Sequence, residues 1–270
     1  MNTTVRMPAV AGQFYPGQRQ VLEHDLDGYT HFQGDKIAAR GCIVPHAGYM
    51  YSGHVAGAVY SRLELPRRFV ILCPNHTGMG DPLAVMSSGE WMTPLGKAPV
   101  DGALANSLKS HYPKLQEDAG AHLREHALEV QLPFLQRLRP DFSFVPITVG
   151  TERYDALEAL GQAIAAALRD FTDDVLVIAS SDMNHYESDA ITRQKDANAL
   201  ERILALDPAG LFNVITRQHV SMCGFGPAIA MLTAAKLRGA THAELIRYAT
   251  SGDISGDRKK VVGYAGVAVI

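Results

Sequence analysis

Five short apolar segments in the sequence contain few polar residues and mostly do not alternate between polar and apolar positions. Strands that are covered on both faces show this pattern, whereas strands with one face in water alternate between apolar and polar residues. The segments comprise residues 39–45, 69–74, 142–149, 175–180 and 261–269. Segments with the apolar spacing of helices lie between them. We therefore predict an α/β fold with a largely parallel or mixed central sheet and helices on both of its faces.

The expected helices cover residues 154–171, 190–206 and 227–237, and Asp207-Pro208 begins a further short helix as N-cap and first residue. Residues 78–100 resemble a loop in which short antiparallel strands can occur, and residues 253–257 resemble a flexible loop. There is no internal repeat and no linker rich in Gly, Ser or Pro. With 270 residues and 47% hydrophobic content, the chain can bury one large core, so we predict a single domain over residues 1–270.

Charge and cysteine content exclude several classes of protein. The net charge of -3 leaves no basic surplus for nucleic-acid phosphates, and no apolar stretch is long enough to span a membrane. The N-terminal residues contain no apolar segment typical of a signal peptide, so we expect a cytoplasmic protein. Three cysteines do not suggest a disulfide framework. Cys42 and Cys73 lie inside apolar segments, and we expect both to pack as buried strand residues.

Three of the apolar segments are followed, after a short turn, by a histidine. His46 follows the first, His76 follows the second, and His185 follows the segment 175–180. Ligands of open α/β sheets bind beyond the carboxyl ends of the strands, so these histidines converge if the three strands are neighbours. A single histidine after a strand is more often a surface or capping residue. The three together favour a polar pocket.

Cys223 lies in a glycine-rich turn that opens a predicted helix. A thiol at a helix N-terminus usually has a lowered pKa, which makes Cys223 a candidate thiolate ligand or nucleophile. The alternative is a small buried residue in a tight turn.

Four further residues are candidates for substrate binding. His126 and Glu129 are three residues apart at the start of a predicted helix that Pro133 is expected to kink, so they share a face. Their alternative is an exposed, charged first turn. Tyr15 and Tyr49 either line the pocket or pack over its rim.

Several motifs occur in an order that is typical of one family. They are Ala11-Gly12-Gln13-Phe14-Tyr15, Pro45-His46-Ala47-Gly48-Tyr49, Pro74-Asn75-His76, Glu125-His126, Leu132-Pro133, Ser180-Ser181-Asp182, His185 and Cys223-Gly224. From about residue 8 to its C-terminus the chain resembles the Memo family. Bacterial and archaeal proteins of this kind resemble protein B of the AmmeMemoRadiSam system. This resemblance implies a functional link to a radical-SAM protein and an AMMECR-type protein.

The Memo family is similar in fold to the class III extradiol dioxygenases, which are called LigB-like. Those enzymes hold a non-haem Fe(II) with two histidines and a carboxylate, and use another histidine as an acid and base. By this resemblance His46 and His76 are the histidine ligands, and Cys223 takes the place of the carboxylate. His185 matches the acid/base histidine, with Asp182 beside it.

A cysteine ligand changes what such a site is expected to bind and do. Fe(II) is the expected metal, and copper and zinc also suit two histidines and a thiolate. A thiolate donates strongly to the metal and is itself oxidised easily, which argues against unchanged extradiol cleavage. The resemblance also implies links to signalling, phosphopeptide binding and metal-dependent redox chemistry, which are described for eukaryotic members.

Four functions therefore stay open. The first is a metal-dependent redox enzyme, similar to a dioxygenase, that acts on an unknown small molecule or peptide. The second is a metal-binding or peptide-binding protein without turnover. The third is a zinc hydrolase that uses a zinc-bound water. The fourth is an enzyme with Cys223 as nucleophile and His185 as its partner.

Overall fold

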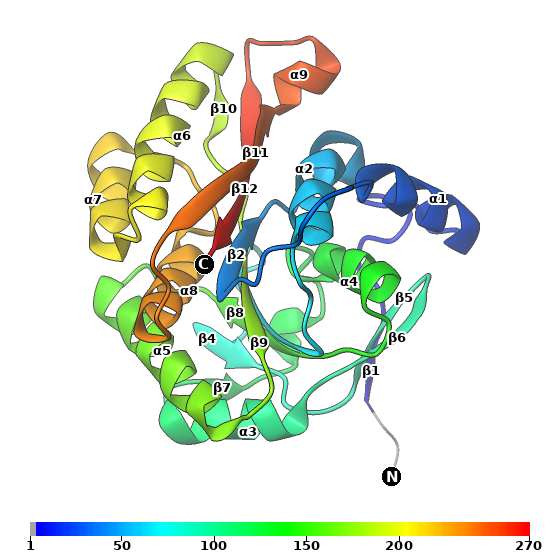
Figure 1. Cartoon of the computed structure of the whole chain (residues 1–270), viewed down its shortest axis with the longest axis vertical. Coiled ribbons are helices and arrows are strands. Elements are labelled where there is room, and N and C mark those ends of the chain that lie inside the picture. The colour runs from blue at the N-terminus through cyan, green and yellow to red at the C-terminus, as the bar shows by residue number, and fades with distance from the viewer. Residues whose placement is uncertain (1–3) are drawn as a thin grey trace.

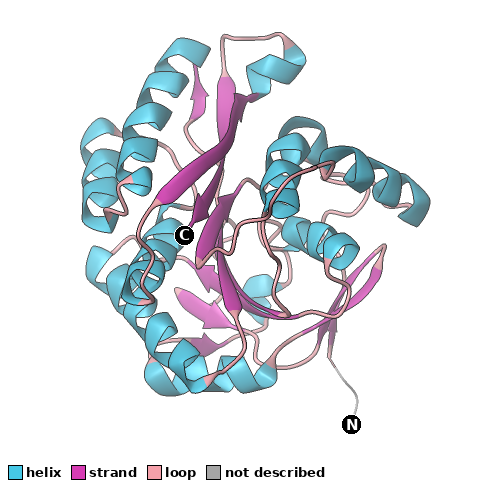
Figure 2. Ribbon diagram, in the orientation of Figure 1, coloured by secondary structure: helices cyan, strands magenta, loops and turns pink. Residues whose placement is uncertain are grey.

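The computed structural model describes residues 4–270, which form two β-sheets surrounded by helices (Figures 1 and 2). Within this range the larger sheet has nine strands in the order β10-β12-β2-β9-β3-β8-β4-β7, with β11 paired to β12. Its strands are β2 (Gly41–Val44), β3 (Arg68–Pro74), β4 (Leu83–Val85), β7 (Gln116–Glu117), β8 (Ser143–Val149), β9 (Val175–Ser180), β10 (His185–Glu187), β11 (Ala243–Thr250) and β12 (Val261–Val269). The smaller sheet contains β1 (Val5–Arg6), β5 (Glu90–Thr93) and β6 (Gly96–Pro99).

The four central strands of the larger sheet, β2, β9, β3 and β8, are parallel to one another. Strand β12 is antiparallel to β2, and β4 is antiparallel to β8, so the sheet is mixed, as the sequence predicted. All five predicted apolar segments form strands of this sheet. Because the central strands are parallel, the turns that follow β2, β3 and β9 leave the sheet at the same edge.

Helices cover both faces of the larger sheet (Figure 2). Side chains alternate along each strand, so Ile43 enters one core while Cys42 and Val44 enter the other. One face is covered by α1 (Arg19–Tyr29), α2 (Tyr49–Arg62) and α4 (Leu132–Leu138). The other face is covered by α5 (Tyr154–Ala167), α6 (Asp189–Leu204), α7 (Pro208–Gln218) and α8 (Phe225–Leu237). Helix α3 (Gly102–His111) packs on α5, and α9 (Ser251–Ser255) precedes β12. Cys42 and Cys73 are buried strand residues, as predicted. Within residues 4–270, no helix combines the length and apolar content needed to cross a bilayer.

Three local predictions are wrong. His126 does not begin an α-helix, because a turn and the short 3₁₀ helix Glu129–Gln131 precede α4. Pro133 lies in the first turn of α4, where its missing N–H costs no hydrogen bond, so it produces no kink. The segment 253–257 overlaps α9, whose start is fixed by a capping box between Thr250 and Asp253. Residues 78–100 contain β4, β5 and β6, and the antiparallel pair of β5 and β6 agrees with the short strands that the sequence allowed there.

Glu129 anchors the N-terminal segment to the body of the protein. It forms a buried ion pair with Arg6 and accepts hydrogen bonds from the backbone N–H groups of Ala9 and Val10. The hydroxyl of Tyr15 also donates to its Oε1 atom, at 2.6 Å. Arg6 in turn donates to two backbone carbonyls, so both charges of this buried pair are surrounded by hydrogen bonds.

Replacing Glu129 by alanine (Glu129→Ala) is expected to lower the free energy of unfolding by about 3–5 kcal/mol, because Arg6 would remain buried without its partner. Urea denaturation measures this loss. Glu23 pairs with Arg19 on the surface, so Glu23→Ala should cost only about 0–1 kcal/mol. Equal, small losses in the two variants would show that the buried pair does not anchor the segment.

Candidate metal centre

A cavity of about 580 Å³ lies at the edge of the sheet where the central parallel strands end. His46 follows β2, His76 follows β3, and Asp182 follows β9. His185 begins β10, and Cys223 precedes α8. All five side chains line the cavity, so the structure brings together the three histidines that follow apolar segments in the sequence.

A buried hydrogen-bond network below the cavity begins at Gln131. Its Nε2 atom donates to the carbonyl of Pro45 at 3.0 Å and to Ser180 Oγ at 2.9 Å, and its Oε1 atom accepts from the Tyr60 hydroxyl. A carbonyl oxygen only accepts, so the contact with Pro45 fixes the orientation of the side-chain amide. Ser180 Oγ therefore accepts a hydrogen bond from Gln131.

Ser180 determines which nitrogen of His46 carries the proton. The Ser180 hydroxyl donates its one proton to the Ala127 carbonyl at 2.6 Å. It has none left for His46 Nδ1, 2.9 Å away, so we assign the proton to Nδ1, which donates to Ser180. The Nε2 atom then has a free lone pair, and it lies 3.1 Å from Cys223 Sγ. Burial and the neighbouring His76 lower the pKa of His46, which keeps the ring neutral.

Glu125 fixes the proton position on His76, as Ser180 does on His46. Its Oε1 atom lies 2.9 Å from His76 Nδ1, and it also accepts from the backbone N–H groups of His76 and Ala127. Burial raises the pKa of Glu125, but the bonds from His76 and Ala127 outweigh burial and lower it to about 2. The ionised carboxylate holds the proton of His76 on Nδ1 and leaves Nε2 free to bind a metal.

The third donor of the cluster is Cys223. One donor atom each from His46, His76 and Cys223 lie within 4.8 Å of one another. The expected lowering of the thiol pKa is wrong for the metal-free protein, because burial, together with the charge of Asp182, raises the pKa of Cys223. Tertiary burial thus outweighs the effect of the helix N-terminus. A bound cation would lower the pKa of Cys223 again, because a coordinated thiol loses its proton.

These donors suit a transition metal. Two imidazole nitrogens with free lone pairs face a soft thiol, and each ring is held by a hydrogen bond on its other nitrogen. Donor atoms of His76, Glu125 and His126 form a second group of similar size. Glu125 in that group is fully buried and already accepts three N–H bonds, so we interpret the second group as support for His76.

Asp182 and His185 complete the polar wall of the cavity. Asp182 Oδ1 accepts from the backbone N–H groups of His46 and Ala47, which fixes the turn after β2. Burial raises the pKa of this carboxyl. His185 Nδ1 lies 2.7 Å from the Ser221 carbonyl, so Nδ1 must carry a proton and Nε2 is free to accept one. His185 thus has the tautomer that a proton acceptor needs.

Only one of the four candidate substrate-binding residues lines the cavity. His126 lines the cavity and stacks on His76, with ring centroids 4.8 Å apart. Glu129 lies outside it in the ion pair with Arg6. Tyr15 and Tyr49 are buried and line a different cavity, so the structure does not bring them to the metal donors.

Sequence reasoning missed two aromatic residues that line the cavity. Phe14 lies against His126, with ring centroids 4.6 Å apart, and Tyr186 follows His185. Tyr186 is 71% exposed and has a φ of 62°, a conformation that costs energy for a residue with a side chain. An exposed tyrosine at φ 62° beside a polar cavity suggests a ligand contact. A positive φ leaves no signal in the sequence here, because Tyr186 stands where glycine or asparagine is usual.

Glu125→Gln should change how stability depends on pH. The pKa of Glu125 is about 2 in the folded protein against an ordinary 4.5, so its ionised form stabilises the fold above pH 4.5. This contribution is lost as the pH falls from about 4.5 to about 2. The wild type should therefore lose its stability advantage over Glu125→Gln across that range, measured by denaturant unfolding of the metal-free proteins. An advantage that is constant with pH would contradict the assigned ion pair.

Comparison with known proteins identifies the family. A family model described as Memo-like protein matches residues 6–268. A MEMO1 family protein of Pyrobaculum arsenaticum is 44% identical over 275 residues, which cover 97% of this chain and 98% of the relative. One of Methanothermobacter thermautotrophicus is 41% identical over 273 residues, covering 97% and 99%. The crystal structure of the uncharacterized protein JW3007 from Escherichia coli K12 shares the fold, with a TM-score of 0.51 at 14% identity, over 84% of this chain and 98% of that one. The chain belongs to the Memo family.

Proposed function

We propose that this protein is a metal-dependent redox enzyme in which His46, His76 and Cys223 bind Fe(II), with copper and zinc as the alternatives. The proposal depends on the protonation and the positions of the three donor side chains. Buried acceptors hold a proton on the Nδ1 atom of each histidine, and both free Nε2 atoms are available near the Cys223 thiol. The substrate is a small molecule or a peptide that enters the cavity.

A bound Fe(II) or copper ion would supply electron transfer and the activation of oxygen, which protein side chains do not provide. The chain supplies proton transfer and orientation. His185 Nε2 accepts a proton from the substrate, and the bond from Nδ1 to Ser221 stabilises the resulting imidazolium. Asp182 keeps the turn of His46 in place. Phe14 and Tyr186 contact the substrate at the cavity wall.

The state of the thiol disfavours a cysteine-nucleophile enzyme. The sequence paired Cys223 with His185, but the histidine in hydrogen-bond contact with Cys223 Sγ is His46, whose Nε2 lies 3.1 Å away, a distance at which a histidine can activate a thiol. Burial, however, raises the pKa of Cys223 and lowers that of His46, so the neutral thiol and the neutral imidazole are the favoured forms. The same two groups become good metal ligands when a cation replaces the thiol proton.

Metal binding provides the first test. Anaerobically purified protein, loaded separately with Fe(II), Cu(I) or Zn(II), should bind about one equivalent of its preferred metal in equilibrium dialysis with elemental analysis. His46→Ala and Cys223→Ala should lose this binding. His185→Asn is the matched control, because it changes the same cavity and leaves the three donors intact. Equal binding by the wild type and both ligand variants would overturn the metal site.

Turnover separates the redox function from hydrolysis. Iron-loaded protein should consume oxygen in the presence of catechols or other reducing substrates. His185→Asn should lower the rate constant about 10²-fold or more while it retains the metal, because a proton acceptor is removed. Activity that Zn(II) restores after chelation, without oxygen consumption, would replace the redox proposal with a zinc hydrolase.

A further inference from the structure

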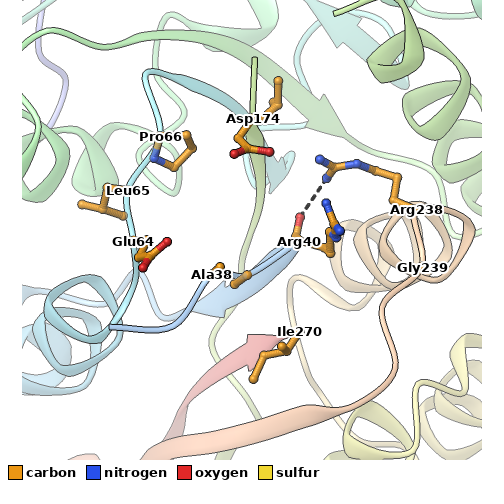
Figure 3. A pocket seen from close by; sticks show the side chains of 11 residues that line it. Ala38, Arg40, Glu64, Leu65, Pro66, Asp174, Arg238, Gly239 and Ile270 are labelled. Carbon is orange, nitrogen blue, oxygen red and sulfur yellow. Dashed lines mark hydrogen bonds between the residues drawn. The ribbon is translucent and has the colours of Figure 1, made fainter. Parts of the chain in front are cut away.

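A second cavity, of about 510 Å³, lies at the opposite edge of the larger sheet. Arg40 lines it immediately before β2, and Asp174 immediately before β9. These are the amino ends of the strands whose carboxyl ends lead to His46 and Asp182. Figure 3 shows two arginines, Arg40 and Arg238, together at one side of this cavity. It is separate from the candidate metal centre and needs its own explanation.

Arg238 is held in place by the backbone. It follows the last residue of α8, and its Nη1 atom donates to the carbonyl of Arg40 at 3.0 Å. Both guanidinium groups are positively charged at any ordinary pH. Burial, followed by the charge of Arg40, lowers the pKa of Arg238, and the charge of Asp174 opposes this shift, so Arg238 is a partly buried cation near an exposed one.

Neither arginine has a carboxylate partner within residues 4–270, although Glu64 and Asp174 line the same cavity. A different arrangement occurs where Arg193 and Arg258 meet elsewhere in the chain. There Asp189 pairs with both arginines, at 2.9 and 2.7 Å, and Asp253 does so at 2.8 and 3.2 Å. Carboxylates form ion pairs with both of those arginines, whereas in the cavity Asp174 acts on Arg238 only as a nearby charge and forms no ion pair with it.

We propose that the cavity binds a small ligand whose oxyanion, a carboxylate or a phosphate, contacts Arg40 and Arg238. Guanidinium groups bind such oxygens with two parallel hydrogen bonds, and the anion removes the repulsion between the two arginines. Apolar side chains of Leu65, Pro66 and Ile270 also line the cavity and can contact the middle of a ligand. A volume of about 510 Å³ suits a small molecule.

The acidic residues of the cavity narrow the choice of ligand. In Figure 3 Glu64 lies across the cavity from the arginines, and Asp174 lies at a third side. Their charges repel a doubly charged phosphate and attract an ammonium group. A carboxylate that carries an amino group at its other end therefore fits the charges of this cavity better than inorganic phosphate does.

Titrations of the full-length protein test the site with 4-aminobutyrate, acetate and inorganic phosphate as probes. Amide chemical shifts from NMR give both the affinity and the location of binding. We expect 4-aminobutyrate to bind most tightly and to shift residues around Gly239. Arg40→Gln and Arg238→Gln should each weaken it by about tenfold or more. Arg217→Gln is the control, because Arg217 is an exposed arginine that lies outside both cavities.

Arg40→Gln decides the outcome if Arg238→Gln unfolds, because the Arg40 side chain is exposed and forms no hydrogen bond with residues 4–270. Tightest binding by phosphate, with the same dependence on both arginines, would identify the oxyanion as a phosphate. No saturable shift with any probe, or equal affinities in the wild type and Arg40→Gln, would overturn the proposal. A His46→Ala background should give the same result, because the site does not depend on the metal.

Discussion

The parallel register of β2, β9 and β3 determines where the chemistry of this protein can occur. Val44 at the end of β2 pairs with Ser180 at the end of β9, and Leu72 near the end of β3 pairs with Ala179. The three turns that follow therefore leave the sheet at one level. A shift of one residue in any strand would exchange its two faces and remove its turn from the group. The hydrophobic cores on both faces prevent such a shift, so burial of apolar side chains also fixes the positions of the polar ones.

Near this edge of the sheet, buried groups outside the cavity fix the proton positions on histidines that line it. Glu125 and Ser180 are fully buried, and each one sets the proton position on a histidine. Buried polar groups are costly unless every donor and acceptor is satisfied, and this network satisfies them through backbone carbonyls and N–H groups. Glu129, a few residues after Glu125, ties the N-terminal segment, which carries Phe14, to the same place. The arrangement of the cavity residues therefore depends on the same buried contacts that stabilise the fold.

The sequence contained enough information for the central strands and for the residues that follow them, because apolar runs and the turns after them are local signals. It did not reveal α2, whose residues include Gly53 and Gly57 and lack a clear apolar stripe. Gly57 is needed because α1 approaches closely there, and a Cβ atom would lie 2.3 Å from the Tyr29 carbonyl oxygen. Glu129 was placed with His126 by helical spacing, but its partner Arg6 is 123 residues away, beyond any local pattern. The raised pKa of Cys223 likewise follows from tertiary burial, which the local helix N-terminus does not predict.

Helix α8 is buried along nearly its whole length, with Cys223 two residues before its first residue and Arg238 directly after its last. Its thirteen residues span about 20 Å. Close contacts hold it on two sides, because a Cβ atom on Gly224 would meet the Ser180 carbonyl at 2.3 Å, and one on Gly161 of α5 would meet the Ala230 carbonyl at 2.5 Å. A helix packed this tightly has little room to shift along its axis. It therefore keeps the residues that border its two ends, Cys223 at the candidate metal centre and Arg238 at the second cavity, at a fixed separation.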